Sequence, residues 1–224
     1  MANPGASTPP DVPTAPKVDY HRNALRILFI LVKGSRPYTG VPVEGYDRVF
    51  RGETKVQALD FWVRYPDYLA DELLSLYEAT GDEECLAAAS EIFAEEEPDL
   101  RRVPMLRRYF GAYEPLDTVL GILKSRRLVL PRSRQMERGT DEHDFLVGTE
   151  APGLIARALA DLPELGWYDR RVDLVLRVAD GRGGYALKER QHRQKEYHDA
   201  QTGDLIPTTA ERVRKRLETL WRAA

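Results

Sequence analysis

Apolar residues recur at helical spacing along most of this chain, and this pattern predicts a mostly α-helical fold. Residues 20–33 form the most apolar stretch, which Gly34 ends. A second apolar stripe runs through residues 54–64, where Thr54 and Gln57 stand three positions apart in the pattern of a capping box. We therefore expect two helices here, the second of them capped by Thr54.

Prolines and glycines divide the following part of the chain. Pro66 interrupts the apolar stripe and restarts a helix, and Gly81 suits the C-terminal cap of that helix. Residues 83–95 predict a short acidic helix. A helical hairpin with an acidic second arm is expected in this region.

The last third of the chain also predicts helices. Residues 149–162 and 163–179 each carry a helical apolar pattern. Residues 185–200 have few apolar positions, which favours a polar helix at the surface or at an interface over one in the core. A final helix is expected from Thr208, with Glu211 in its capping box.

The final helix carries one apolar stripe among basic residues. Its apolar members are Val213, Leu217, Leu220 and Trp221. A stripe of this kind docks either on its own domain or on a partner protein. We assign these four residues to partner docking and residues 201–224 to a C-terminal amphipathic docking helix.

Residues 101–149 give the clearest β signal, in the pattern of a winged helix. A helix start at Glu114 precedes apolar positions at helical spacing. Strands are expected at residues 128–130 and 145–147, and the arginine-rich loop 132–138 between them would be the wing tip. The segment thus predicts a basic helix that leads into a β-hairpin.

These patterns together predict a mostly α fold with a small β-hairpin: a winged-helix core with additional C-terminal helices. Proline-rich residues 1–17 cannot bury enough surface to order themselves and are expected to form a disordered tail. Residues 18–200 would form the winged-helix domain with its helical extension. One more strand is expected near Val49.

The composition indicates the broad class of protein to which this chain belongs. The chain has 224 residues, 42% of them hydrophobic, which is enough for a core. Its single cysteine, Cys85, forms no intrachain disulfide, and the sequence shows no charged-then-apolar leader. The apolar run at residues 27–32 is far shorter than the roughly 20 residues that span a bilayer. We expect a cytoplasmic protein without a membrane partner.

Charge is distributed unevenly along the chain. Residues 1–100 hold 9 Lys/Arg and 18 Asp/Glu, whereas residues 101–224 hold 24 and 18. Residues 101–138 alone carry 10 bases and 3 acids. A basic surface of this kind suits phosphate contact, while two solvated faces of opposite charge would give the same count.

Seven cations of the basic segment are the candidate contacts to double-stranded DNA or to an acidic partner surface. They are Arg107, Arg108, Lys124, Arg126, Arg127, Arg132 and Arg134. Lys and Arg side chains bind phosphates and release counterions from the duplex, so this contact would be sensitive to salt. Charge and expected position are the basis of this assignment.

Other constellations favour structural roles. Asp47, Glu53 and Lys55 resemble the acid and lysine set of metal-dependent nucleases, but Lys55 opens a predicted helix, which favours capping. The glycines of residues 181–184 lack the spacing of a phosphate-binding loop.

Three histidines are the remaining candidate metal ligands. His143, His192 and His198 match no zinc spacing. We expect no catalytic residue, no metal site and no cofactor, and hence a protein that is not an enzyme.

Three segments carry a resemblance to a known family. RGETKVQALDFWVRYPDYLADELL, RRYFGAYEPLDTVLGILKSRRLV and FLVGTE resemble the winged-helix middle component of ABC-ATPase three-component systems. That class includes the accessory subunit of Lamassu-type bacterial defence complexes, and the resemblance spans residues 20–200. It implies a non-catalytic subunit that joins an SMC- or Rad50-like ATPase to an effector, often a nuclease. It supplies no residue-level binding motif.

A second function stays open on the sequence. A dimeric winged-helix transcription regulator would place residues 116–127 in the major groove of DNA. Such a regulator should read sequence as a stable homodimer, whereas an adaptor should bind DNA with little preference. The acidic first half of the chain favours the adaptor.

Overall fold

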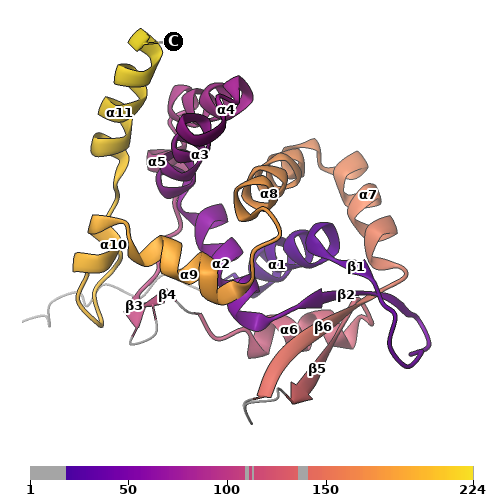
Figure 1. The fold of residues 1–224 in the computed structure, drawn as a ribbon. Coiled ribbons are helices and arrows are strands. Elements are labelled where there is room, and N and C mark those ends of the chain that lie inside the picture. The colour runs from indigo at the N-terminus through magenta and orange to yellow at the C-terminus, as the bar shows by residue number, and fades with distance from the viewer. Residues whose placement is uncertain (1–18, 109–110, 113, 136–140, 224) are drawn as a thin grey trace, which may run out of the picture.

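The computed structural model of the chain describes residues 19–108, 111–112, 114–135 and 141–223. The expected tail at residues 1–17 and part of the expected wing tip, residues 136–138, lie outside these ranges. Figure 1 shows helices stacked over a small antiparallel sheet, whose hairpin projects at the lower edge of the molecule. The expectation of a mostly helical chain with a small β element is confirmed.

Helices in the first hundred residues follow the predicted apolar stripes. They are α1 (Tyr20–Gly34), α2 (Glu53–Arg64), α3 (Pro66–Thr80), α4 (Glu83–Ala94) and α5 (Glu97–Leu100). Asp19 caps α1, because its carboxylate accepts the backbone N–H of Arg22 at 3.0 Å. Pro66 opens α3 and Gly81 ends it at φ +72°, both as expected.

The start of α2 differs from the expected capping box. The helix begins at Glu53, so Thr54 already lies inside it. The Gln57 side chain points inward instead of back along the helix: its amide nitrogen donates to the carbonyl oxygen of Glu114 at 2.8 Å. Its amide oxygen accepts the N–H of Glu114 at 3.2 Å. Gln57 therefore ties α2 to the segment before α6 and leaves the helix start uncapped by Thr54.

The sheet joins strands from two distant parts of the chain. Its strands are β1 (Arg36–Pro37), β2 (Tyr46–Arg51), β5 (Val129–Gln135) and β6 (Asp141–Gly148), in the order β1-β2-β6-β5. The hairpin β5–β6 and the strand near Val49 were both expected and are confirmed. α6 (Asp117–Ser125) leads directly into β5.

The helix expected before the hairpin is present as α6, but its expected basic character is wrong. Arg107–Arg108 form a short strand, β3, paired with β4 (Gly111–Ala112). Lys124 is the only base in α6 itself. The cations of this segment therefore lie on two separate elements and on the turn that follows α6.

The C-terminal third contains more short helices than the pattern predicted. They are α7 (Ala151–Asp161), the 3-10 helix Pro163–Leu165, α8 (Gly166–Ala179), α9 (Gly184–His192), α10 (Lys195–Asp199) and α11 (Ala210–Ala223). The expectation of one polar surface helix at residues 185–200 is wrong, because two helices stand there and bury Leu187, Gln191 and Tyr197. A hydrogen bond holds α9 to α2: the side-chain amide of Gln191 donates to the Ala58 carbonyl oxygen at 2.8 Å.

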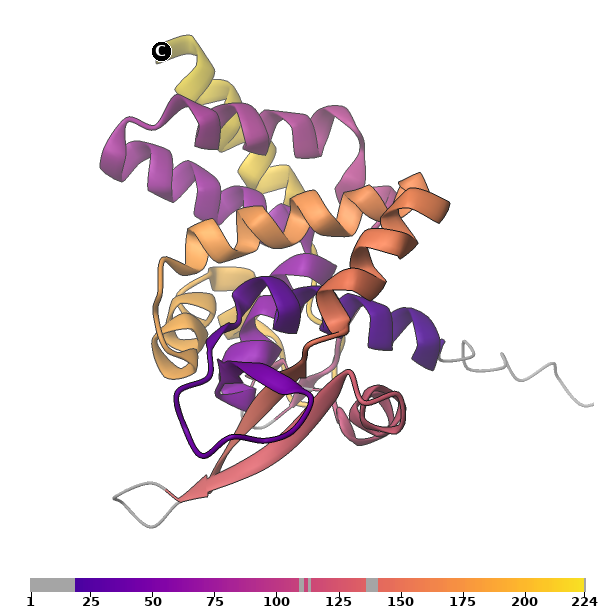
Figure 2. The same ribbon diagram turned by 90° about the vertical axis from the view of Figure 1, so that its right-hand side faces the viewer.

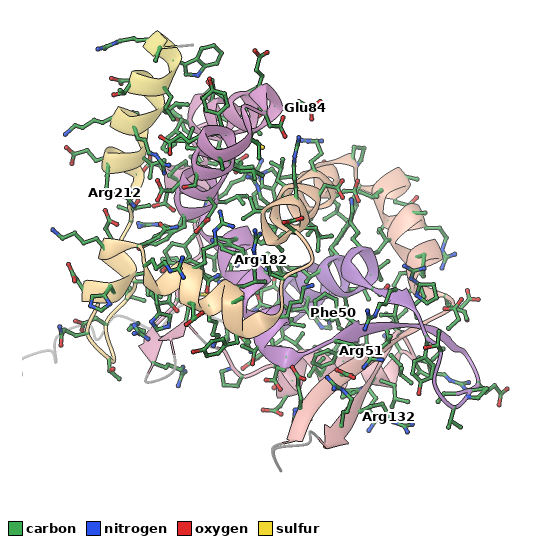
Figure 3. The ribbon with its side chains drawn as sticks, in the orientation of Figure 1. Phe50, Arg51, Glu84, Arg132, Arg182 and Arg212 are labelled. Carbon is green, nitrogen blue, oxygen red and sulfur yellow. The ribbon has the colours of Figure 1, made fainter. Side chains whose placement is uncertain are left out.

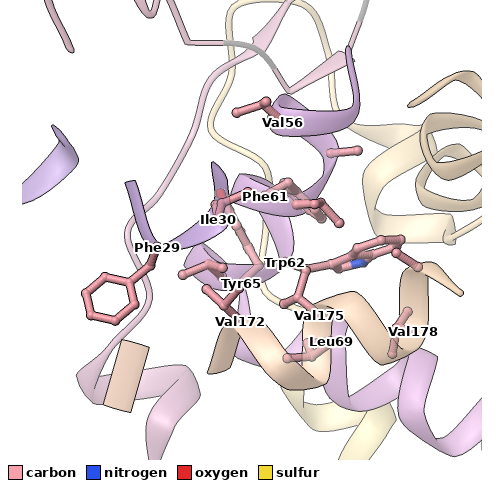
Figure 4. Close-up of a cluster of buried hydrophobic side chains, with 14 of the residues drawn as sticks. Phe29, Ile30, Val56, Phe61, Trp62, Tyr65, Leu69, Val172, Val175 and Val178 are labelled. Carbon is pink, nitrogen blue, oxygen red and sulfur yellow. The ribbon is translucent and has the colours of Figure 1, made fainter. Parts of the chain in front are cut away.

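The core is centred on α2. Figure 4 shows Phe61, Trp62 and Tyr65 between α1 and α8, whose Val172 and Val175 complete the cluster. All five side chains are fully buried. Figure 2 shows α8 between the α3–α4 pair above and α1 below. Burying large apolar side chains stabilises a fold by about 1.5–3 kcal/mol each, so this cluster holds α1, α2 and α8 together.

Candidate nucleic-acid interface

α6 is anchored by one face and open on the other. Leu116, Val119 and Leu123 are buried at 3–5% exposure. The opposite face carries only exposed residues, which are Asp117, Thr118, Gly121, Lys124 and Ser125. This outer face of α6 is short and has no large side chain except Lys124.

A basic turn follows α6, formed by Lys124, Arg126 and Arg127. The backbone fixes it: the N–H of Arg127 donates to the carbonyl oxygen of Lys124 at 2.9 Å, and the N–H of Leu128 donates to that of Leu123 at 3.0 Å. Arg127 adopts the left-handed conformation with φ +56°. All three cations are exposed, and among the described residues none of them has a carboxylate partner.

The end of β6 holds the basic turn in place. The N–H of Gly148 donates to the Leu128 carbonyl oxygen at 2.8 Å. A side chain at Gly148 would collide with the backbone carbonyl oxygen of Arg127. Gly148 thus permits close contact between sheet and turn, a role that the sequence analysis missed.

The two hairpin arginines have different surroundings. Arg134 is neutralised by the return strand: its Nε lies 2.8 Å from Asp144 Oδ2 and its Nη2 lies 2.7 Å from Glu142 Oε2. The hydrogen bond that Arg134 donates to Asp144 is the main cause that raises the pKa of Arg134 above its ordinary value. Arg132 is exposed and has no ion pair within the described residues. Of the two arginines in the described strands of the hairpin, Arg132 is therefore the one that offers a free charge, at the position shown in Figure 3.

A groove of about 470 Å³ separates α6 from the hairpin. Lys124 and Gly121 line one wall, and His143 lies on the other, where its Nδ1 is 2.9 Å from Glu53 Oε2. Glu53 and Asp117 supply two carboxylates to the lining. Lys124 and Arg132 supply two cations to the same lining, so its charges balance. Arg126 and Arg127 of the basic turn are not part of the lining and add further positive charge next to Lys124.

Gly121 is unusual inside a short helix. A β-carbon there would meet no atom within 4 Å, so packing within the described chain does not require glycine. Glycine in a helix interior costs about 0.5–1 kcal/mol relative to alanine. The absence of a side chain lets another backbone approach the outer face of α6 closely.

Arg107 and Arg108 lie on another side of the molecule. The Arg107 guanidinium carbon lies 5.1 Å from the centre of the Tyr197 ring, and its Nη1 donates to the Arg108 carbonyl oxygen at 2.9 Å. Figure 1 shows β3 beside α9 and α10, away from the hairpin. Five of the seven predicted cations thus gather at α6 and the hairpin, and these two do not.

The nuclease-like set does not assemble a metal site. The Glu53 carboxylate pairs with His143, and burial lowers the pKa of Lys55, with Arg36 as a second cause. No group of three His, Cys, Asp or Glu side chains that could hold a metal ion occurs among the residues that the structure describes.

The glycine run at residues 181–184 has a packing role. A β-carbon at Gly184 would collide with the backbone of Thr54 and Lys55. The start of α9 therefore lies directly against the first turn of α2, which explains this glycine without a phosphate ligand.

The predicted docking stripe of α11 is largely internal. Val213 and Leu217 are buried at 0% and 6% exposure, and Leu220 packs partly on the same core. Arg212 and Arg216 fasten the helix to Asp71 of α3. Of the four assigned residues only Trp221, which is 52% exposed, remains open to a partner.

No protein-family model, curated protein or solved structure matches this chain. Within the described residues, no helix combines the length and the apolar character that crossing a membrane requires.

Proposed function

We propose that this chain binds double-stranded DNA through the basic turn, Arg132 and the outer face of α6. One observation carries the proposal: Lys124, Arg126, Arg127 and Arg132 are exposed cations without carboxylate partners in the described structure, gathered around one end of α6 and the neighbouring strand. Unpaired cations attract phosphates, because each contact releases counterions from the duplex.

The connectivity supports a winged-helix type of core around this surface. α1 packs against α2 and α6, and β2 pairs with β6, which pairs with β5. α6 and the hairpin would then correspond to a recognition helix and a wing, with α3–α5 inserted before them.

Low sequence preference follows from the distribution of charge. The four cations sit at the end of α6 and on β5, where they would contact phosphates. The outer face of α6 offers Thr118 and Ser125 as short polar groups and Lys124 as its only long one. Phosphate contacts would therefore outnumber base contacts.

We further propose that the protein is a non-catalytic adaptor that joins an SMC- or Rad50-like ATPase to an effector in a defence complex. The resemblance of its sequence to the middle components of such systems is the basis for this assignment. Partners of that kind could dock on two surfaces. One is Trp221 at the exposed end of α11, and the other is formed by the exposed residues of the acidic helix α4.

The dimeric transcription regulator is the second candidate. The observation that favours it is Gly121, which would let α6 approach the floor of a major groove closely. A regulator requires a stable homodimer, so light scattering of the purified protein together with sequence selection from a random DNA pool separates the two functions.

The test of DNA binding is fluorescence anisotropy with a random-sequence duplex over a series of salt concentrations. The variant Lys124→Ala/Arg126→Ala/Arg127→Ala should reduce the slope of log affinity against log salt by roughly 2 to 3, since each phosphate contact contributes about 0.9. The control Arg157→Ala/Arg170→Ala/Arg222→Ala removes the same charge elsewhere. Equal slopes for the two triple variants would refute the proposed surface.

A further inference from the structure

A second hollow lies far from the hairpin, between α3, α9, α10 and α11. Its volume is about 710 Å³, within the range of about 300–1,000 Å³ that is typical of small-molecule sites. Five cations line it: Arg182, Arg190, Arg193, Lys195 and Arg212. Figure 3 shows Arg182 and Arg212 on different elements at this side of the molecule. The carboxylates in the lining are Asp71, Glu72 and Glu189.

The two buried carboxylates are already occupied by groups of the chain. Asp71 accepts from Arg212 at 3.1 Å and from Arg216 at 2.5 Å. Glu72 forms an ion pair with Arg190, and its Oε1 accepts the amide nitrogen of Gln194 at 3.0 Å. Burial raises the pKa of Glu72, which Arg190 partly offsets. The floor of the cavity is thus close to neutral.

The charge that remains is positive. Arg193 and Lys195 are exposed, and neither has an ion pair among the described residues. Arg182 has one long ion pair, 3.4 Å to Asp180, and its Nη1 donates to the carbonyl oxygens of Val178 and Ala179 at 3.4 and 3.5 Å. Glu189 is the one carboxylate in the lining without a cation partner in the described chain. Three cations against two carboxylates, Glu189 and Asp180, leave a positive charge that favours an anion at the mouth of the cavity.

Gln194 adds an unsatisfied acceptor. Its side chain is buried at 8% exposure, and its Oε1 has no hydrogen-bond partner. Glu72 fixes the orientation of the amide, because a carboxylate accepts only from the amide nitrogen. The Gln194 oxygen therefore requires an N–H or O–H donor, and an unsatisfied buried acceptor is costly.

We propose that this cavity binds a small phosphorylated ligand that also carries a hydroxyl or amino donor. Arg193, Lys195 and Arg182 hold the phosphate, and Gln194 accepts the donor. A nucleotide and a sugar phosphate share this chemistry. The site does not depend on DNA binding, since its residues lie on other elements.

Isothermal titration calorimetry on the full chain tests the site with ATP, glucose 6-phosphate and pyrophosphate as probes. Binding of ATP alone identifies a nucleotide site, and binding of glucose 6-phosphate alone identifies a sugar-phosphate site; either supports the proposal if Arg193→Ala/Lys195→Ala weakens it at least tenfold. Gln194→Met should weaken the same probe and leave pyrophosphate unchanged. The matched control Arg157→Ala/Arg222→Ala should bind as the unmodified chain does.

Three results would overturn the proposal. One is no heat of binding with any of the three probes. Another is equal weakening by the Arg193→Ala/Lys195→Ala variant and its control. The third is binding of duplex DNA, but of none of the small probes, that depends on Arg193 and Lys195, because the surface would then belong to a macromolecular interface. Circular dichroism of each variant confirms that it is folded.

Discussion

The α-carbon of Gly148 faces the backbone carbonyl oxygen of Arg127 so closely that no side chain fits between them. This contact joins the end of β6 to the basic turn. Gly148→Ala should destabilise the protein by about 1–3 kcal/mol, the usual cost of inserting an atom into a packed site. It should also weaken DNA binding, because the turn must move.

Urea denaturation and fluorescence anisotropy measure the two effects of Gly148→Ala. Gly153→Ala in α7 is the control, since the nearest atom to its β-carbon is the end of the Arg157 side chain at 3.5 Å. Full stability of Gly148→Ala would contradict the described contact.

Gly121 should show the opposite balance between stability and binding. Gly121→Ala fills open space, so it should stabilise the isolated protein by about 0.5–1 kcal/mol through the helix preference of alanine. If α6 approaches DNA closely, the added methyl group should lower DNA affinity. Thermal unfolding and anisotropy on the same sample decide it; a stabilised variant with unchanged affinity would remove the outer face of α6 from the interface.

Arg132 and Arg134 stand two residues apart and should respond differently to truncation. Arg134→Ala leaves the buried Asp144 without its nearest cation, which should cost about 1–3 kcal/mol. Arg132→Ala should change stability by less than about 0.5 kcal/mol, because the side chain is exposed. DNA affinity should fall more with Arg132→Ala. Chemical denaturation and anisotropy of the two single variants provide the comparison, and a reversed order in either measurement would contradict the assignment.

His192 should make stability depend on pH in mildly acidic solution. Burial lowers its pKa in the folded protein, and the neighbouring Arg107, Lys188 and His198 lower it further. The unfolded chain then takes up a proton first, so stability should fall as pH drops below about 6.5, the ordinary pKa of histidine, until the folded protein is protonated too. Urea denaturation across this range should show a shallower pH dependence for His192→Gln; an unchanged profile would exclude this histidine as the cause.

The sequence predicted the helices that are buried through regularly spaced apolar side chains. α1 and α3 carry regular stripes of Leu, Ile and Tyr between a capping aspartate or proline and a glycine, so their positions and faces follow from periodicity. α9 and α10 were misjudged because they have few apolar residues in their patterns. Gln191 is buried through its hydrogen bond to Ala58, and Tyr197 packs against the Phe61 ring while its hydroxyl accepts the N–H of Ala112.

Candidate site residues were less predictable than the helices. Arg107 and Arg126 look alike in the sequence, but the chain reverses direction between them at β3 and β4, so they reach different sides. Arg134 lies opposite Glu142 because of the hairpin register, which the sequence pattern alone left open. Gly121 is a signal in the sequence that could have indicated the outer face of α6, because this glycine stands inside a predicted helix where no turn is expected.

Two residues on the apolar stripe of α11, Leu217 and Trp221, should respond differently to truncation. Leu217 is 6% exposed, so Leu217→Ala should destabilise the isolated protein by about 2–5 kcal/mol. Trp221 is 52% exposed, so Trp221→Ala should leave stability within about 1 kcal/mol and reduce only the capture of a partner. Thermal unfolding of the purified variants, followed by affinity purification from the native host, measures both. Equal destabilisation by the two changes would show that Trp221 also belongs to the core. Val213 and Leu217 hold the helix to its own chain, so a loss of partner capture with Leu217→Ala alone would be a consequence of unfolding.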